Sequence, residues 1–173
     1  MPEETTKQGP AGIPPAAVEL ADRLGPAGVL PADPFGVWIR LKVVGGHADE
    51  RYEFRFEADG LGEVTTSLVD RIRKIEKDVR FAKMARSDVA RILKSLDIRR
   101  MAPAARAAKP IPPGSVVGRL TVGDGREEIG VVFMADRGQA KGAGVRLDPA
   151  VEEAVEQIYR VAARHLKVKD VRP

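Results

Sequence analysis

Residues 37–58 read VWIRLKVVGGHADERYEFRFEA, and they carry the clearest structural signal in this chain of 173 residues. On both sides of the turn GGHADE, apolar residues alternate with charged ones, except that Trp38 shares the face of Arg40 and Lys42 in the first run. In the second run, Tyr52, Phe54 and Phe56 share one face, and arginine and glutamate occupy the other. Because alternation with a period of two is typical of half-buried strands, we predict an antiparallel hairpin with one solvated face.

Further strands follow from turn signals. Asp59-Gly60 marks a turn into a third strand, EVTTSL, and Asp124-Gly125 separates two apolar runs in the manner of a second hairpin. The run GVVFM, 130–134, is apolar on both faces, which favours a central position in the sheet.

Two terminal segments predict helices. AAVELADRLG, 16–25, follows two prolines and ends at a glycine, which suits a short helix. The segment 149–167 begins after Asp148 with Pro149 at the first helical position. Its apolar stripe is Val151, Val155, Ile158, Ala162 and Leu166.

The segment 72–97 also shows helical spacing. Ile72, Ile75, Val79 and Ala82 recur every three or four residues, and a second register runs from Ala85 through Val89, Ile92 and Leu93 to Leu96. The change of register predicts a bend within 80–87, with Ser87 as the N-cap of the second part. A short strand, VRFAKM, is the competing interpretation of 79–84.

Together these signals predict an α+β fold in two layers. An antiparallel sheet of four to six strands carries two main helices, from 72–97 and 149–167, on one face. We expect a disordered tail at 1–15 and a single domain over 16–173. Within the domain, 102–114 is Ala/Pro-rich and basic, which predicts an exposed linker.

Charge is unevenly distributed along the chain. Between Arg71 and Lys109, thirteen Lys and Arg stand against four Asp and Glu, a local net charge of +9. The whole chain is only +4, so the other residues sum to −5. A basic segment on an acidic body predicts an acidic partner, an acidic protein surface before nucleic acid. A solvated helix face is the simpler interpretation of the same charges.

The candidate partner-binding residues lie on the predicted helix. Arg73, Lys77 and Arg80 form a stripe opposite the apolar one, with Lys83 nearby. Trp38 is a second candidate: it is either covered by the N-terminal helix or exposed as an interface anchor. Nucleic-acid binding by the same basic segment stays open as an alternative, although the aromatic face at 52–56 is better explained as core.

Catalytic signals are weak. The chain has no cysteine and two histidines, which excludes thiolate chemistry and predicts no metal site, no cofactor and no recognisable catalytic set. A small enzyme with a site near His47 or the 135–144 loop remains a second alternative. The glycines of that loop do not form a phosphate-binding motif. No secretory signal or membrane span is expected, so we predict a cytoplasmic, non-enzymatic binding or accessory module.

Overall fold

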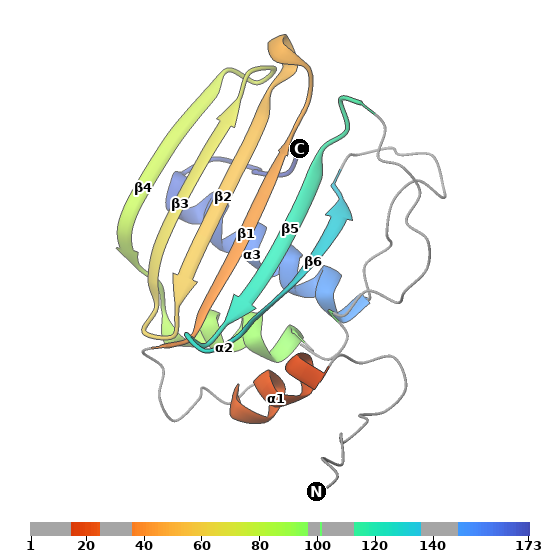
Figure 1. Cartoon of the computed structure of the whole chain (residues 1–173). Helices are drawn as coiled ribbons and strands as arrows, with labels where there is room; N and C mark the ends of the chain where they lie inside the picture. Colours follow the sequence, from red (N-terminus) through yellow and green to blue (C-terminus); the bar gives the residue numbers. More distant parts are fainter. Residues whose placement is uncertain (1–14, 25–35, 97–100, 102–112, 136–148) are drawn as a thin grey trace, which may run out of the picture.

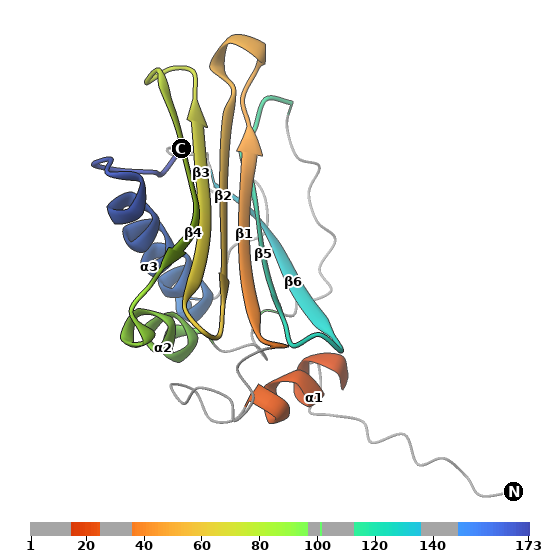
Figure 2. The same cartoon turned by 90° about the vertical axis from the view of Figure 1, so that its left-hand side faces the viewer.

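The computed structural model describes residues 15–24, 36–96, 101, 113–135 and 149–173. These residues form a six-stranded antiparallel sheet with helices packed on one face, as the sequence predicts (Figures 1 and 2). The strand order is β4-β3-β2-β1-β5-β6. The strands are β1 (Trp38–Gly45), β2 (Tyr52–Asp59), β3 (Glu63–Asp70), β4 (Ile75–Lys83), β5 (Val117–Gly123) and β6 (Glu128–Met134).

The hairpin of β1 and β2 forms the middle of the sheet, and its predicted faces are confirmed. Leu41 lies opposite Phe56 and Val43 opposite Phe54. These four side chains are almost completely buried, whereas Arg40 on the other face of β1 is exposed. The connection between the two strands includes a short 3-10 helix, η2 (Ala48–Glu50).

The helical layer consists of α2 (Arg86–Ser95) and α3 (Pro149–Leu166), which lie side by side on the same face of the sheet (Figure 2). The rings of Phe54 and Tyr159 lie 5.5 Å apart at an angle of 56°, which is a favourable tilted arrangement. Ile158 of α3 and Ile92 of α2 are buried in the same core cluster. The predicted C-terminal helix is therefore confirmed to within one residue.

The N-terminal helix, α1 (Pro15–Leu24), lies at the end of the sheet where β5 turns into β6 (Figure 1). Arg23 Nε donates to Asp124 Oδ2 at 2.5 Å, and its Nη2 donates to Glu127 at 3.2 Å. The other carboxylate oxygen of Asp124 accepts the backbone N–H groups of Arg126 and Glu127. The Asp-Gly hairpin therefore forms as predicted and also anchors α1.

The predicted helix over the first part of 72–97 is wrong. Residues 71–74 are a turn and 75–83 are strand β4, so the competing strand interpretation of 79–84 is closer to the observed fold. The helix starts at Arg86, where the carbonyl of Ala85 accepts the N–H groups of Asp88 and Val89. Ser87 therefore lies inside the first turn and is not the N-cap.

The position predicted for GVVFM is also wrong. Its strand, β6, is at an edge of the sheet, and Val132 is 44% exposed on the face away from the helices. Three other predicted features lie outside the described residues: the tail 1–15 apart from Pro15, the linker 102–114 apart from Pro113 and Gly114, and the loop after Ala135. None of the helices in the described part of the chain is long and apolar enough to cross a membrane.

The buried aromatic ring of Phe54 gives a first prediction. Phe54 has no exposed surface and contacts Tyr159, so Phe54→Ala should lower the free energy of unfolding by about 3–5 kcal/mol through lost burial and a residual cavity. Urea unfolding followed by circular dichroism measures this. The same change at Phe81, which is 72% exposed, is the matched control and should cost under about 1 kcal/mol. Equal losses at the two positions would contradict the assigned core.

The contacts of Asp124 give a second prediction. Burial opposes ionisation of this carboxyl, but the hydrogen bonds from Arg23 and from the backbone of Glu127 and Arg126 outweigh it and lower the pKa from 3.8 to about 2. Ionised Asp124 therefore stabilises the fold above about pH 4, and this contribution is lost as the pH falls toward 2. Over this range Asp124→Asn should lose less stability than the wild type in thermal melts. Asp49→Asn, at an exposed position, should follow the wild type; identical curves for all three proteins would refute the assignment.

Candidate functional site

The structure gathers the predicted basic residues at one edge of the sheet. Arg73 lies in the turn between β3 and β4, and Lys77, Arg80 and Lys83 lie in β4 itself. In the described part of the chain, β4 pairs with β3 alone and leaves its other side free of strand pairing (Figure 1). The predicted cluster is therefore a set of neighbours, but on an edge strand and not on a helix.

These basic side chains point to both sides of the sheet. Lys77 lies opposite Leu68, whose buried side chain faces the helices. Lys83 lies opposite Glu63 on the other face, and its Nζ is 3.2 Å from the Glu63 carboxylate. Because side chains opposite each other share a face, a partner that touches both lysines has to approach along the edge.

A β-bulge interrupts the edge strand. Thr66 lies opposite Val79 and Val64 opposite Ala82, so β4 contains one residue more than β3 between these pairs. Phe81, within the bulge, has φ of +55° and is 72% exposed. Positive φ is rare for a residue with a bulky side chain and costs free energy. In the sequence, Phe81 stands out only because it does not fit the predicted helical stripe.

This edge of the sheet, called the basic edge below, is strongly cationic. The turn and β4, residues 71–83, contain six basic and two acidic residues. Arg80 pairs with Asp78 at 2.9 Å, but the two side chains are 71% and 51% exposed. The Lys83–Glu63 pair is similarly open to solvent. Exposed pairs contribute little to stability, so these cations can exchange their present partners for others at low cost.

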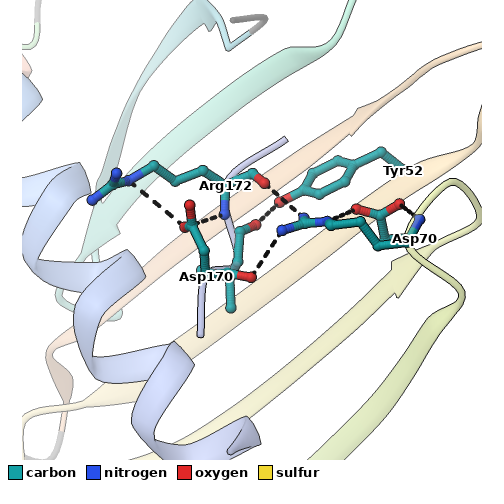
Figure 3. A network of polar contacts seen from close by, with 6 residues as sticks. Tyr52, Asp70, Asp170 and Arg172 are labelled. Carbon is teal, nitrogen blue, oxygen red and sulfur yellow. Dashed lines mark hydrogen bonds and ion pairs between the residues drawn. The ribbon is translucent and has the colours of Figure 1, made fainter. Parts of the chain in front are cut away.

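Arg73 has a different role from the other members of the cluster. Its Nε is paired with the buried carboxylate of Asp70, while Nη1 and Nη2 donate to the carbonyls of Asp170 and Arg172 at 3.0 and 2.7 Å. Figure 3 shows this network with Tyr52, whose hydroxyl donates to the Val171 carbonyl. Burial raises the pKa of Tyr52, which keeps the hydroxyl protonated as a donor. Arg73 is exposed, as predicted, but it lies in a turn, and its guanidinium also holds the segment after α3 against the sheet; its predicted role in partner binding stays a prediction.

Trp38 is separated from the basic edge by β2 and β3. Its half-buried ring lies against Gly123 of β5, where any side chain would collide with it. The guanidinium of Arg40 lies 4.2 Å from the ring centroid, in cation–π geometry. Arg40 also pairs with Glu57 at 2.9 Å. The geometry gives Trp38 a packing role on the open face, and its predicted role in partner binding stays a prediction.

Within the described residues, neither alternative enzymatic site, near His47 or in the 135–144 loop, shows a catalytic arrangement of side chains. His47 is exposed in the β1–β2 connection, its ring lies over Gly114, and within the described residues its nitrogens make no side-chain hydrogen bond. The 135–144 loop lies outside the described residues except for Ala135. The described residues also contain no group of three metal-ligating side chains.

A depression of about 680 Å³ lies at the end of the sheet where the β1–β2 and β3–β4 connections meet. Acidic and basic side chains are balanced in its lining, so it adds no net attraction for an anion. The charged residues that line it are Asp49, Arg51, Asp70, Arg71, Lys74 and Glu76.

Comparison of the sequence with models of known protein families and with curated proteins finds no match.

The network around Arg73 gives a third prediction. Arg73→Ala leaves the Asp70 carboxylate, which is only 7% exposed, without its cation, and it also removes two donors to the C-terminal segment. We expect a loss of about 2–4 kcal/mol in the free energy of unfolding, because an uncompensated buried charge is costly. Lys77→Ala on the neighbouring strand should cost under about 0.5 kcal/mol. Denaturant titration compares the two variants, and equal stability would show that Arg73 is only a surface residue.

Proposed function

We propose that this protein is a non-enzymatic binding module that presents the basic edge strand β4 to an acidic partner protein. The observation that carries the proposal is the position of β4: it is an edge strand, and it holds Lys77, Arg80 and Lys83 on an exposed backbone. The proposed surface leaves out Arg73, because its guanidinium already donates to two backbone carbonyls of the C-terminal segment.

The charge supports an interaction over simple solvation. Lys74 and Lys77 have no ion pair among the described residues, and the pairs of Arg80 and Lys83 are exposed. The molecule therefore leaves a cluster of like charges along one narrow edge. Such a cluster attracts an acidic surface over several ångströms and favours its orientation during encounter.

Nucleic acid is the weaker candidate for the same surface. Sequence-tolerant binding of single strands uses aromatic side chains as stacking platforms. Tyr52, Phe54 and Phe56 are buried under the helical layer, so they offer no such platform. Nucleic acid stays in the design of the test as a separate outcome.

Charge reversal gives a fourth prediction. In Lys77→Glu/Arg80→Glu/Lys83→Glu the fold should remain, because the three side chains are exposed and weakly paired. Affinity for the acidic protein recovered with the wild type from its host should fall by at least about tenfold, and the salt dependence of binding should shrink. The measurement is surface plasmon resonance at two salt concentrations, with circular dichroism as the control for folding.

A matched variant separates the edge from total charge. Arg126→Glu/Arg160→Glu/Lys169→Glu makes the same change in net charge at exposed positions outside β4, and it should bind like the wild type. Equal binding by the β4 variant would refute the proposed function. Loss of the recovered partner after nuclease treatment would favour the nucleic-acid alternative instead.

A further inference from the structure

We infer that two copies of this chain associate through β6, the edge strand at the other side of the sheet from β4. The two β6 strands pair antiparallel about a twofold axis at Gly130, and the sheet becomes continuous across both copies. This second surface leaves both β4 strands free, so the inference does not rest on the function proposed for β4. It follows from three properties of β6: an unprotected edge, backbone groups that face outward, and nearby charges that match between two copies.

The two edges of the sheet differ in how they are protected. Edge strands of soluble proteins usually carry charges, a proline or a bulge, which prevent pairing with other chains. β4 has both charges and a bulge. Residues 129–134 of β6 have no charge and no proline, and their register with β5 is regular. In the described chain β6 pairs with β5 alone, so its other side is a template for pairing with another strand.

The backbone groups of every second residue of β6 point away from β5. The N–H of Ala135 donates to the carbonyl of Val116 at 2.9 Å, and the carbonyl of Glu127 accepts from Asp124 at 3.2 Å. Odd-numbered residues of this strand therefore face β5, because the two kinds of position alternate along an antiparallel pair. The residues that present N–H and C=O groups at the free edge are Glu128, Gly130, Val132 and Met134. A second copy offers the same groups, so antiparallel pairing satisfies both edges at once.

Two charged side chains flank this edge on the face away from the helices. Arg119 of β5 lies opposite Val132, and a Cβ placed on Gly130 would lie 3.5 Å from its Nε, so the arginine extends over β6 toward the free edge. Glu128 is exposed on the same face, because it is four residues from Val132 in the same strand. Neither Arg119 nor Glu128 has an ion pair with another described residue. Each copy therefore brings one cation and one anion without a partner to the same edge.

These charges select the register. With Gly130 on the twofold axis, Glu128 of each copy lies opposite Val132 of the other copy. It then lies beside the Arg119 that extends over that strand, and symmetry forms this ion pair twice. A register shifted to full overlap of the two strands would place Glu128 opposite Met134 instead and move it away from Arg119.

The apolar side chains of β6 are compatible with this register. On the helix side, partly buried Ile129 of one copy lies opposite Val131 of the other. On the opposite face, pairing covers part of Val132, which is 44% exposed in the single chain. Helix α1 lies near the turn between β5 and β6 (Figure 1). Antiparallel pairing directs the two turns toward opposite ends of the shared sheet, which keeps the two α1 helices apart.

Sedimentation equilibrium of the full chain tests the association. We expect the mass of two chains at about 50 µM and dissociation on dilution. Arg119→Glu and Glu128→Arg should each weaken the dimer about tenfold, because each brings like charges together twice. The double variant restores the attraction and should dimerise within about threefold of the wild type.

Lys42→Glu is the matched control for charge. It makes the same change as Arg119→Glu at the neighbouring position in β1, one strand further from the edge, and should dimerise like the wild type because solvent and salt screen charges at that distance. A wild type that stays monomeric, single variants that assemble normally, or a double variant no better than the single ones would overturn the proposal.

Single cysteines test the register, since the chain has none of its own. An equal mixture of Glu128→Cys and Val132→Cys, both at exposed positions, should form a mixed disulfide under mild oxidation, because paired Cα atoms are about 5.5 Å apart. Val132→Cys alone should not form one, since its two copies are at least about 13 Å apart. Non-reducing electrophoresis measures the products. A covalent dimer of Val132→Cys alone, or none from the mixture, would overturn the register about Gly130.

Discussion

The contact between the aromatic face of β2 and helix α3 is the constraint on which the rest of this structure depends. Phe54 packs on Tyr159, and Ile158 is buried in the same core cluster. The alternation of side chains along β2 then decides which residues of every other strand face the helices. The strand registers place Leu41 and Leu120 on the same face as Phe56 on one side of β2, and Thr66 on that face on the other side. In β4, at the edge of the sheet, the same alternation continues past residue 79 only because the bulge takes up one extra residue.

That bulge explains why part of the fold could be predicted from the sequence and part could not. The central hairpin and α3 each follow one clean period, and both were expected correctly. In β4, the inward-facing positions are Ile75, Lys77, Val79 and Ala82. Lys77 can occupy such a position because it lies at an open edge, and the extra residue moves the next apolar position from 81 to 82. The apolar spacing becomes four and then three, which imitates a helix.

The candidate site, too, could be predicted only in part from the sequence. Composition alone located the basic segment, because a local excess of charge does not depend on fold. It could not separate Arg73 from Lys77, since two of the acceptors of Arg73 are backbone carbonyls about a hundred residues away in the sequence. Nor could it give Phe81 a role, because a strained φ depends on a register that only the assembled sheet defines. β6 was misplaced for a related reason: apolar residues on both faces indicate burial, but an edge strand also tolerates an exposed valine.

The hydrogen bonds of Arg73 join two parts of the chain that are synthesised at different times. Strands β1 to β4 leave the ribosome in succession, and each can pair with the one before it. The carbonyls that hold Arg73, however, belong to residues synthesised 97 and 99 positions later. During translation, the turn beside β4 therefore lacks these hydrogen bonds while the neighbouring strands are already present. The cationic character of this edge then protects the nascent chain, because charged edges resist pairing with other unfinished strands.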